Sequence, residues 1–285
     1  MTVNSAAPRA QESGHVAAPL GVFDSGLGGL TVVRALRRVL PDEDIVYLGD
    51  TARVPYGTRG AVTVVKYASA CARHLVSHRV KAIVIACNTV SAVAPEQLRI
   101  DLDLPVLGVI EPGARAAVAA TKTGRIGILA TPGTIFSEAY TRAVTTLSTR
   151  TEVFGQAAPL LVPLAEEGWT EGDVPRLAVR RYLEPLARAK VDVIVLGCTH
   201  YPLFFSIIEE EAKSMMGEHV RVVDSATTVA AETRSFFQAR GLLAPPRARA
   251  GEIHLFVTDV PRSFSDMARR FLGDERVPEA EQVDL

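Results

Sequence analysis

The sequence contains little cysteine, almost no net charge and no long hydrophobic run, and each shortage argues against a class of protein. Its three cysteines are odd in number and lack Cys-x-x-Cys spacing, which argues against a disulfide framework or a zinc site and for reduced thiols. The formal net charge of -1 provides no basic field for nucleic acid or an anionic membrane, so a small-molecule substrate is favoured. No apolar run approaches the ~18 residues that a membrane-spanning helix needs.

The remaining composition is that of an ordinary globular protein. Hydrophobic residues make up 48% and charged residues 22% of the 285 residues, and a chain of this length usually divides into two domains. Residues 1–19 mix Ala, Pro, Ser, Glu and Arg without an apolar core of signal-peptide length. We therefore expect a disordered N-terminal extension over residues 1–19 and a cytoplasmic protein.

Two stretches, residues 83–89 and 193–200, dominate the interpretation. Each is a run of β-branched and aliphatic residues, typical of a strand buried on both faces, and each ends on a cysteine followed by small polar residues. The cysteines, Cys87 and Cys198, therefore lie where strands end. Because ligands bind at the carboxyl ends of the strands in parallel α/β sheets, we expect two facing thiols in a binding cleft.

A glycine-rich turn follows the first apolar strand, over residues 20–31. A dinucleotide-binding fingerprint would place a third glycine at Thr31, so that function is disfavoured. The pattern favours a tight strand-to-helix turn whose free N–H groups can hold an anion, with Asp24 and Ser25 at its mouth. The helix expected after the turn has one buried stripe, formed by Leu30, Val33, Leu36 and Leu40.

The second half of the chain resembles a copy of the first. Residues 125–134 repeat the strand and turn of residues 21–31 without the acidic residue, and the Cys198 strand repeats the Cys87 strand. Near-constant offsets indicate two α/β lobes of similar topology. The offsets are 106, 111 and 113 residues, for Gly21 to Gly127, Cys87 to Cys198 and Glu111 to Asp224.

This repeat predicts an α/β protein of two similar, pseudo-symmetric lobes with mainly parallel sheets and an active site in the cleft between them. Lobe one is expected over residues 20–107 plus 222–285, because the C-terminal elements have no counterpart in the second half and need a sheet edge to cover. Lobe two is expected over residues 108–221. Cys87 and Cys198 should lie on opposite walls of the cleft.

Other interpretations of the cysteines remain open at this point. Either strand-end cysteine alone can be a small apolar filler, and Cys71 shares a helix face with Val64, Ala68 and Leu75, which predicts a buried packing thiol. A Cys–His amide hydrolase is the next alternative, because His200 follows Cys198 by two residues, although it leaves the second thiol unexplained. A two-lobed small-molecule binding protein is another, although binding needs no paired thiols. No cluster of His, Cys and carboxylates accompanies either thiol, so no metal is expected.

Four motifs together carry a resemblance to a known family. They are Val-Phe-Asp-Ser-Gly-Leu-Gly-Gly at 22–29, Val-Pro-Tyr-Gly at 54–57, Ala-Cys-Asn-Thr at 86–89 and Gly-Cys-Thr-His-Tyr-Pro-Leu at 197–203. From about residue 21 to about residue 259, the chain resembles the glutamate racemases of the cofactor-independent aspartate/glutamate racemase family. The resemblance implies interconversion of L- and D-glutamate by direct Cα proton transfer, without pyridoxal phosphate or metal, supplying D-glutamate for peptidoglycan.

The same resemblance implies roles for individual residues. Cys87 and Cys198 are similar to the family's two acid/base residues. Asp24 is similar to the carboxylate that assists the first thiol and His200 to the group that assists the second, with Glu166 as a further polar assistant. The substrate-binding residues expected are Asp24, Ser25, Pro55, Tyr56, Gly57, Asn88, Thr89, Thr199 and His200. Glutamate is the expected partner, no cofactor is expected, and a homodimer is left open.

The chemistry of cysteine agrees with these roles. Inverting a stereocentre by proton transfer needs a base on one face of the carbon and an acid on the other, and a duplicated fold can supply one from each lobe. The free thiol has a pKa of about 8.5, so a modest local change sets the thiolate fraction, and one residue can serve as base or acid.

Overall fold

The computed structural model describes residues 16–260, 264–273 and 277–285. Of the N-terminal extension expected over residues 1–19, residues 1–15 lie outside the described residues. The backbone oxygens of Val16 and Pro19 accept hydrogen bonds of 2.8 and 2.9 Å from Lys81 Nζ and Lys81 N. The chain therefore contacts the fold from Val16 onward.

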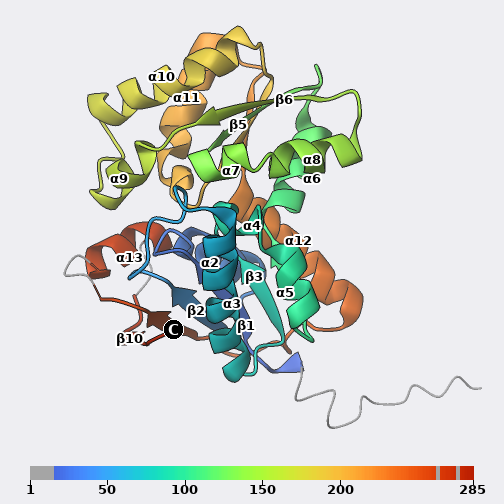
Figure 1. Cartoon of the computed structure of the whole chain (residues 1–285), viewed down its shortest axis with the longest axis vertical. Helices are drawn as coiled ribbons and strands as arrows, with labels where there is room; N and C mark the ends of the chain where they lie inside the picture. Colours follow the sequence, from blue (N-terminus) through green and yellow to red (C-terminus); the bar gives the residue numbers. More distant parts are fainter. Residues whose placement is uncertain (1–15, 261–263, 274–276) are drawn as a thin grey trace, which may run out of the picture.

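The described chain forms two lobes, each built around one parallel sheet and stacked along the long axis of the molecule (Figure 1). The first sheet has the strand order β10-β9-β2-β1-β3-β4, and the second has the order β6-β5-β7-β8. Every strand pair is parallel. The first-sheet strands are β1 (Leu20–Asp24), β2 (Ile45–Gly49), β3 (Ala82–Ile85), β4 (Val106–Gly108), β9 (Ile253–Val257) and β10 (Ala280–Gln282). The second-sheet strands are β5 (Arg125–Ala130), β6 (Glu152–Ala157), β7 (Val193–Gly197) and β8 (Arg221–Asp224).

The strand orders confirm the expected repeat. The segment β2-β1-β3-β4 of the first sheet has the same order as the whole second sheet, β6-β5-β7-β8. Strand β9 then pairs with β2, with Ile45 opposite Ile253, so the chain returns to the first sheet as expected. The chain leaves the first sheet after β4 and the second after β8. The residue boundaries expected at 107/108 and 221/222 thus fall inside these two strands.

Helices cover the faces of both sheets. Helix α6 follows β4 of the first sheet and contacts β7 and β8 of the second, while α12 follows β8 and packs against α2 of the first lobe. These two helices carry the chain between the lobes. The helices are α2 (Leu30–Val39), α3 (Ala61–Ser77), α4 (Asn88–Ser91), α5 (Pro95–Asp101), α6 (Ile110–Ala120), α7 (Pro132–Phe136), α8 (Ala139–Leu147), α9 (Leu161–Glu166), α10 (Asp173–Arg188), α11 (Phe205–Met216), α12 (Ser225–Arg240) and α13 (Phe264–Leu272), with a 3₁₀ helix, η1 (Tyr201–Phe204).

Two helix starts differ from the pattern-based expectation. The apolar run of residues 106–110 predicts a strand to residue 110, but β4 ends at Gly108, and Glu111 and Pro112 lie in the first turn of α6. Proline suits that turn because it has no N–H to leave unpaired, and an acidic residue there interacts favourably with the helix dipole. The small polar residues after Cys87 predict a loop with a helix from about Ser91, but α4 begins earlier, at Asn88, directly after Cys87. The thiol is therefore held between a strand end and a helix start.

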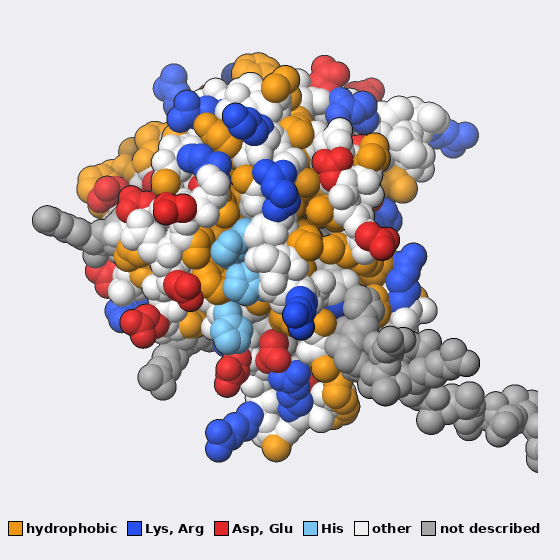
Figure 2. All heavy atoms as spheres, turned by 60° about the horizontal axis from the view of Figure 1, so that its bottom comes forward, with side chains coloured by type: hydrophobic (Ala, Val, Ile, Leu, Met, Phe, Trp, Pro, Cys, Tyr) orange, Lys and Arg blue, Asp and Glu red, His pale blue; other side chains and the backbone are white. Residues whose placement is uncertain are grey.

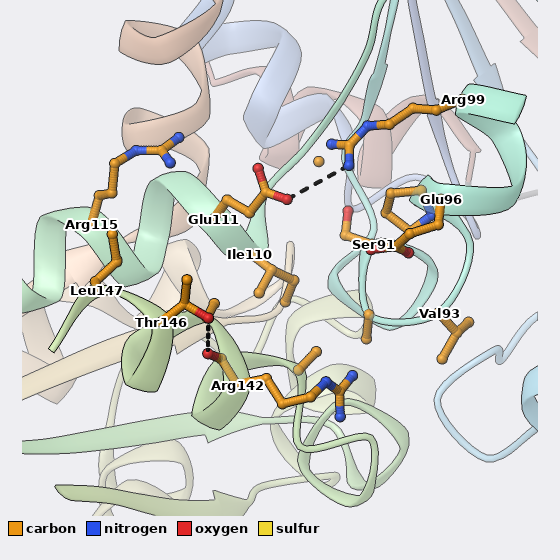
Figure 3. Close-up of a pocket in the computed structure, with 15 residues that line it drawn as sticks. Ser91, Val93, Glu96, Arg99, Ile110, Glu111, Arg115, Arg142, Thr146 and Leu147 are labelled. Atoms are coloured by element: carbon orange, nitrogen blue, oxygen red, sulfur yellow. Dashed lines mark hydrogen bonds and ion pairs between the residues drawn. The ribbon is translucent and has the colours of Figure 1, made fainter. Parts of the chain in front are cut away.

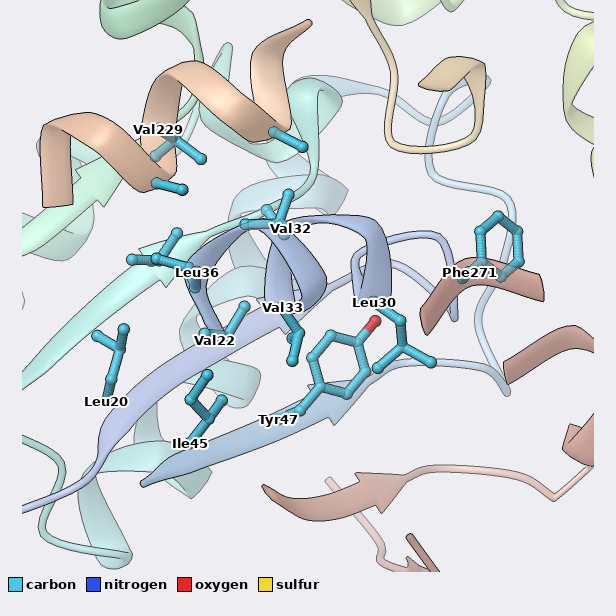
Figure 4. Close-up of a cluster of buried hydrophobic side chains, with 14 of the residues drawn as sticks. Leu20, Val22, Leu30, Val32, Val33, Leu36, Ile45, Tyr47, Val229 and Phe271 are labelled. Carbon is cyan, nitrogen blue, oxygen red and sulfur yellow. The ribbon is translucent and has the colours of Figure 1, made fainter. Parts of the chain in front are cut away.

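The core confirms the buried stripe expected on α2. Leu30, Val33, Leu36 and Leu40 are all buried. They pack against β1 and β2 in a cluster that also receives Phe271 from α13 (Figure 4). On the opposite side of this sheet, Cys71 is fully buried in a separate cluster with the apolar face of α3, which confirms it as a packing thiol.

A buried ion pair joins distant segments at the amino-terminal ends of β2 and β3. Lys81 Nζ lies 2.5 Å from Glu43 Oε2 and donates to the backbone oxygens of Val16 and Leu242, each at 2.8 Å. Both side chains are almost fully buried, so removing the ammonium leaves a buried carboxylate without its charge partner.

We expect Lys81→Ala to lower the free energy of unfolding by about 3–5 kcal/mol, the range for breaking a buried pair. Urea unfolding followed by circular dichroism measures the change. Lys213→Ala is the matched control, because Lys213 forms a partly exposed i,i+4 pair of 3.1 Å with Glu209, worth about 0.3–0.5 kcal/mol. Equal losses in the two variants would contradict the prediction.

Basic and acidic side chains are mixed on the surface, in agreement with their nearly equal numbers in the sequence. On the face shown in Figure 2, Lys and Arg side chains are interspersed with Asp and Glu. Within the described ranges, no helix combines the length and apolar character needed to cross a membrane.

Candidate active site

The two strand-end thiols line one cleft between the lobes. Cys87 and Cys198 are both 6% exposed, and they contribute to a cavity of about 320 Å³. Every expected site residue lines this cavity except Asp24, which is fully buried. The structure therefore brings together residues from both halves of the repeat, at the carboxyl ends of β3 and β7.

On the first side of the cleft, Cys87 is held as a protonated thiol. It follows β3 and precedes the first residue of α4, and its Sγ lies 3.5 Å from Ser25 Oγ. Burial, followed by the charge of Asp24, raises the pKa of Cys87 to about 12. At neutral pH this thiol is a proton donor.

Asp24 occupies the glycine-rich turn that was expected to hold an anion. Its Oδ2 accepts hydrogen bonds from Gly29 N at 2.9 Å and Gly26 N at 3.3 Å, so the turn binds a carboxylate of its own chain. Its Oδ1 is buried and has no hydrogen-bond partner among the described residues. Burial raises the pKa of Asp24, although His200 and the backbone N–H groups act in the opposite direction.

On the second side, His200 links Cys198 to Glu166. His200 Nδ1 lies 3.8 Å from Cys198 Sγ, and His200 Nε2 lies 3.2 Å from Glu166 Oε1. Burial lowers the pKa of His200, but the hydrogen bonds to Cys198 and Glu166 outweigh burial and raise this pKa to about 10. His200 is therefore an imidazolium at neutral pH, and an imidazolium beside a cysteine stabilises the thiolate.

The raised pKa of His200 predicts a pH-dependent contribution to stability. A group whose folded-state pKa lies above its unfolded value of about 6.5 stabilises the protein fully below that value and loses the effect as pH rises toward 10. We therefore expect His200→Asn to lower Tm more at pH 6 than at pH 10, measured against the wild type in matched buffers. A Tm difference that grows with pH would have the wrong sign.

The glycine-rich turn also contacts the second thiol's loop. A Cβ at Gly28 would lie 2.5 Å from Thr199 Oγ1 and 2.6 Å from His200 Nδ1, and Thr31 Oγ1 donates to the backbone oxygen of Thr199 at 3.0 Å. Gly28 thus allows the two lobes to approach each other at His200.

For the racemisation that the family resemblance implies, we expect Gly28→Ala to lower kcat/KM about a hundredfold, because a displacement of ~1 Å at catalytic groups has that effect. Gly60→Ala is the control, since a Cβ at Gly60 meets nothing within 4 Å. Polarimetry at several glutamate concentrations measures both variants. Near-normal activity of Gly28→Ala would show that the contact at His200 is unimportant.

A hydroxyl cluster across the cleft was not predicted from the sequence. Thr89 Oγ1 lies 3.0 Å from Thr131 Oγ1 and 3.3 Å from Thr134 Oγ1. Thr131 follows β5 as Ser25 follows β1, at the same offset of 106 residues that relates Gly21 to Gly127. The repeat therefore contained the signal that could have identified this residue.

Two residues that were expected to bind substrate form hydrogen bonds to other protein side chains with their polar groups. The hydroxyl of Tyr56 donates to the buried carboxylate of Asp50, so this hydroxyl points into the first lobe although the residue lines the cleft. The amide of Asn88 accepts from Tyr140 Oη at 2.8 Å and donates to Ser225 Oγ at 3.3 Å. Asn88 therefore ties α4, α8 and α12 together behind the thiol.

A larger cavity, of about 680 Å³, lies on α5, α6 and α8 (Figure 3). Three arginines line it, Arg99, Arg115 and Arg142, and Arg99 Nη1 lies 3.6 Å from Glu111 Oε1. None of the described residues lining this cavity is a cysteine or a histidine. The two strand-end thiols and His200 therefore line the smaller cleft and not this cavity.

Two parallel α/β lobes that present one thiol each to a shared cleft define a racemase architecture. The chain belongs to the Asp/Glu/hydantoin racemase family, whose model matches residues 30–233.

Individual relatives agree with this assignment. The chain is 48% identical over 266 residues to a glutamate racemase of Geobacter metallireducens, covering 93% of this chain and 96% of the relative. A glutamate racemase isoform from Bacillus anthracis superposes with a TM-score of 0.87 at 38% identity, covering 94% of this chain and 98% of that one. The Francisella tularensis glutamate racemase, solved with D-glutamate, gives a TM-score of 0.86 at 35% identity and the same coverage. These similarities favour the racemase over a Cys–His hydrolase or a binding protein.

Proposed function

We propose that this chain interconverts L-glutamate and D-glutamate by moving the Cα proton between Cys198 and Cys87. The observation that carries the proposal is the placement of two thiols at equivalent positions of a repeat, both lining one cleft. Two groups on different lobes can address opposite faces of one carbon, which inversion by proton transfer requires. The product D-glutamate would serve peptidoglycan synthesis.

In the direction from L to D, Cys198 is the base and Cys87 is the acid, as the family resemblance implies. The Cys198 thiolate, stabilised by the His200 imidazolium, removes the Cα proton of L-glutamate. The electron pair of the broken C–H bond delocalises into the α-carboxylate, and the Cys87 thiol then donates its proton to the opposite face. The cleft is left with a Cys198 thiol and a Cys87 thiolate, which is the form that accepts D-glutamate. The return reaction uses the same groups in exchanged roles.

Polar groups at the strand ends provide the substrate contacts in this proposal. Ser25 and Thr89 line the first side of the cleft and Thr199 lines the second, and each of the three carries a hydroxyl group. Such donors hold the α-carboxylate and stabilise the negative charge that develops beside Cα. Asp24 Oδ1, which has no hydrogen-bond partner among the described residues, is free to accept a hydrogen bond or a proton on the first side of the site.

The division into lobe one (residues 20–107 plus 222–285) and lobe two (108–221) is part of the same proposal, supported by the two matching sheets. Two reduced thiols suit the cytoplasm, where disulfides are rare. A homodimer is left open by the sequence, and sedimentation velocity of the purified chain decides between monomer and dimer.

Incubation with single enantiomers tests the activity. L-glutamate, D-glutamate, the aspartate enantiomers and L-glutamine are each incubated with the purified chain in D₂O. We expect loss of optical rotation with Cα deuteration, seen by NMR, for glutamate from either side. Ammonia release from glutamine without racemisation would indicate the hydrolase instead, and binding without turnover would indicate a binding protein.

A further inference from the structure

We infer that helix α13 positions the His200–Glu166 pair across the cleft, with Arg270 and Phe271 as positioning residues for proton transfer at Cys198. The inference rests on the proposed two-thiol function. It adds two residues from the C-terminal segment, which has no counterpart in the repeat, to a site otherwise built from repeated strand ends.

Arg270 binds the end of the helix that carries Glu166. Its Nη1 donates to the backbone oxygen of Glu166, the last residue of α9. The guanidinium also packs on the next turn, because a Cβ at Gly168 would lie 2.7 Å from Arg270 Cζ. Gly168 has a φ of +79°, a conformation that favours glycine, so this turn is shaped to receive the guanidinium. Arg270 thereby fixes the backbone from which the Glu166 carboxylate reaches His200.

Phe271, the next residue, holds the histidine ring itself. The two rings lie 5.1 Å apart between centroids at an angle of 80°, an edge-to-face arrangement. Phe271 is fully buried in the core of the first lobe with Leu30 and Tyr47, as Figure 4 shows. A side chain packed on all sides has one position, so it provides a rigid wall for the imidazole.

These contacts cross from one lobe to the other. Helix α13 packs against α2 of the first lobe, whereas Glu166 follows β6 and His200 follows β7 of the second sheet. Both contacts lie on the Cys198 side of the cleft. The alignment of the His200–Glu166 pair therefore depends on how closely the lobes approach, and a change in α13 should affect proton transfer at Cys198 rather than at Cys87.

The test uses conservative variants with controls on the same helix. Phe271→Leu removes the ring edge but keeps an apolar side chain, and its control is Phe264→Leu, the same change at another buried position of α13. Arg270→Ala removes the contact with Glu166, and Arg270→Lys keeps the charge. Their control is Arg269→Ala, which removes an exposed arginine 3.7 Å from Asp266. Thermal unfolding identifies any variant that does not fold, and Arg270→Gln then replaces Arg270→Ala.

The first readout is the primary isotope effect on kcat/KM, measured separately with Cα-deuterated L- and D-glutamate. Because the equilibrium constant is one, kcat/KM falls equally in both directions, and we expect a loss of about tenfold to a hundredfold in Phe271→Leu and Arg270→Ala. Proton transfer at Cys198 becomes more rate-limiting, so the isotope effect rises for L-glutamate and falls for D-glutamate. Arg270→Lys should restore part of the activity. A merely structural role would leave both isotope effects at wild-type values.

The second readout does not depend on racemisation. Alkylation by iodoacetamide, quantified for each peptide by mass spectrometry, reports the thiolate of each cysteine. We expect Cys198 to react several-fold more slowly in Phe271→Leu and Arg270→Ala, with Cys87 and both controls unchanged. Unchanged Cys198 alkylation together with unchanged isotope effects would overturn the inference. If the wild-type chain does not racemise glutamate, the proposed function fails, and alkylation alone still decides whether α13 positions His200.

Discussion

Cys87→Ser and Cys198→Ser should each lower glutamate racemisation by about 10⁴-fold, the largest effects expected for any single substitution. A serine hydroxyl is too weak an acid to supply a base at neutral pH, and loss of a general acid/base group typically removes up to about 10⁴ in rate. Optical rotation with each enantiomer as substrate measures the loss. Cys71→Ala is the control. Because Cys71 is buried in an apolar cluster and does not line the cleft, this variant should racemise glutamate at the wild-type rate.

The two serine variants should retain slow Cα hydrogen exchange with the solvent, each with the opposite enantiomer of glutamate. With Cys198 replaced, Cys87 can still remove and return the Cα proton of D-glutamate, so slow deuterium exchange from D₂O should appear in D-glutamate alone. With Cys87 replaced, the exchange should appear in L-glutamate alone. The assignment of Cys87 to the D face and Cys198 to the L face follows the family resemblance. Identical exchange in both variants, or near-normal racemisation in either, would indicate a mechanism with one base.

Asp24→Asn and His200→Asn should lower kcat/KM by about 10²–10³-fold, each by impairing a different thiol. Asp24 Oδ1 is buried near Cys87 and unpartnered among the described residues, whereas His200 contacts Cys198 directly. Because kcat/KM must fall equally in both directions, the difference should appear in exchange without inversion. Asp24→Asn should slow exchange into D-glutamate more, and His200→Asn should slow exchange into L-glutamate more.

Glu166→Gln provides a graded comparison for this prediction. Its carboxylate reaches His200 Nε2 at 3.2 Å and is 45% exposed, so it supports the imidazolium through a partly solvated contact. We expect the same direction of effect as in His200→Asn but a smaller magnitude. If Glu166→Gln and Asp24→Asn slowed exchange into the same enantiomer, the division of the site into two sides would be wrong.

Much of the fold was predictable because its signals are local. A run of β-branched residues ending on cysteine and small polar residues marks a strand and its carboxyl end within eight positions, and the chain contains that pattern twice. The repeat offsets then relate the strands to one another, and the orders β2-β1-β3-β4 and β6-β5-β7-β8 confirm the relation. Patterns do not fix exact ends, so the start of α6 at Ile110 was missed.

The sequence by itself determined that two thiols end two buried strands of a duplicated α/β fold, because strand periodicity and motif spacing are properties of short segments. Only the tertiary structure decided which side chains surround those thiols. Asn88 meets Tyr140 and Ser225 across separations of 52 and 137 residues, and Arg270 reaches Glu166 across 104. Such contacts depend on how the lobes and the C-terminal helix pack together. The burial that raises the pKa of Cys87 likewise exists only once both lobes enclose the cleft.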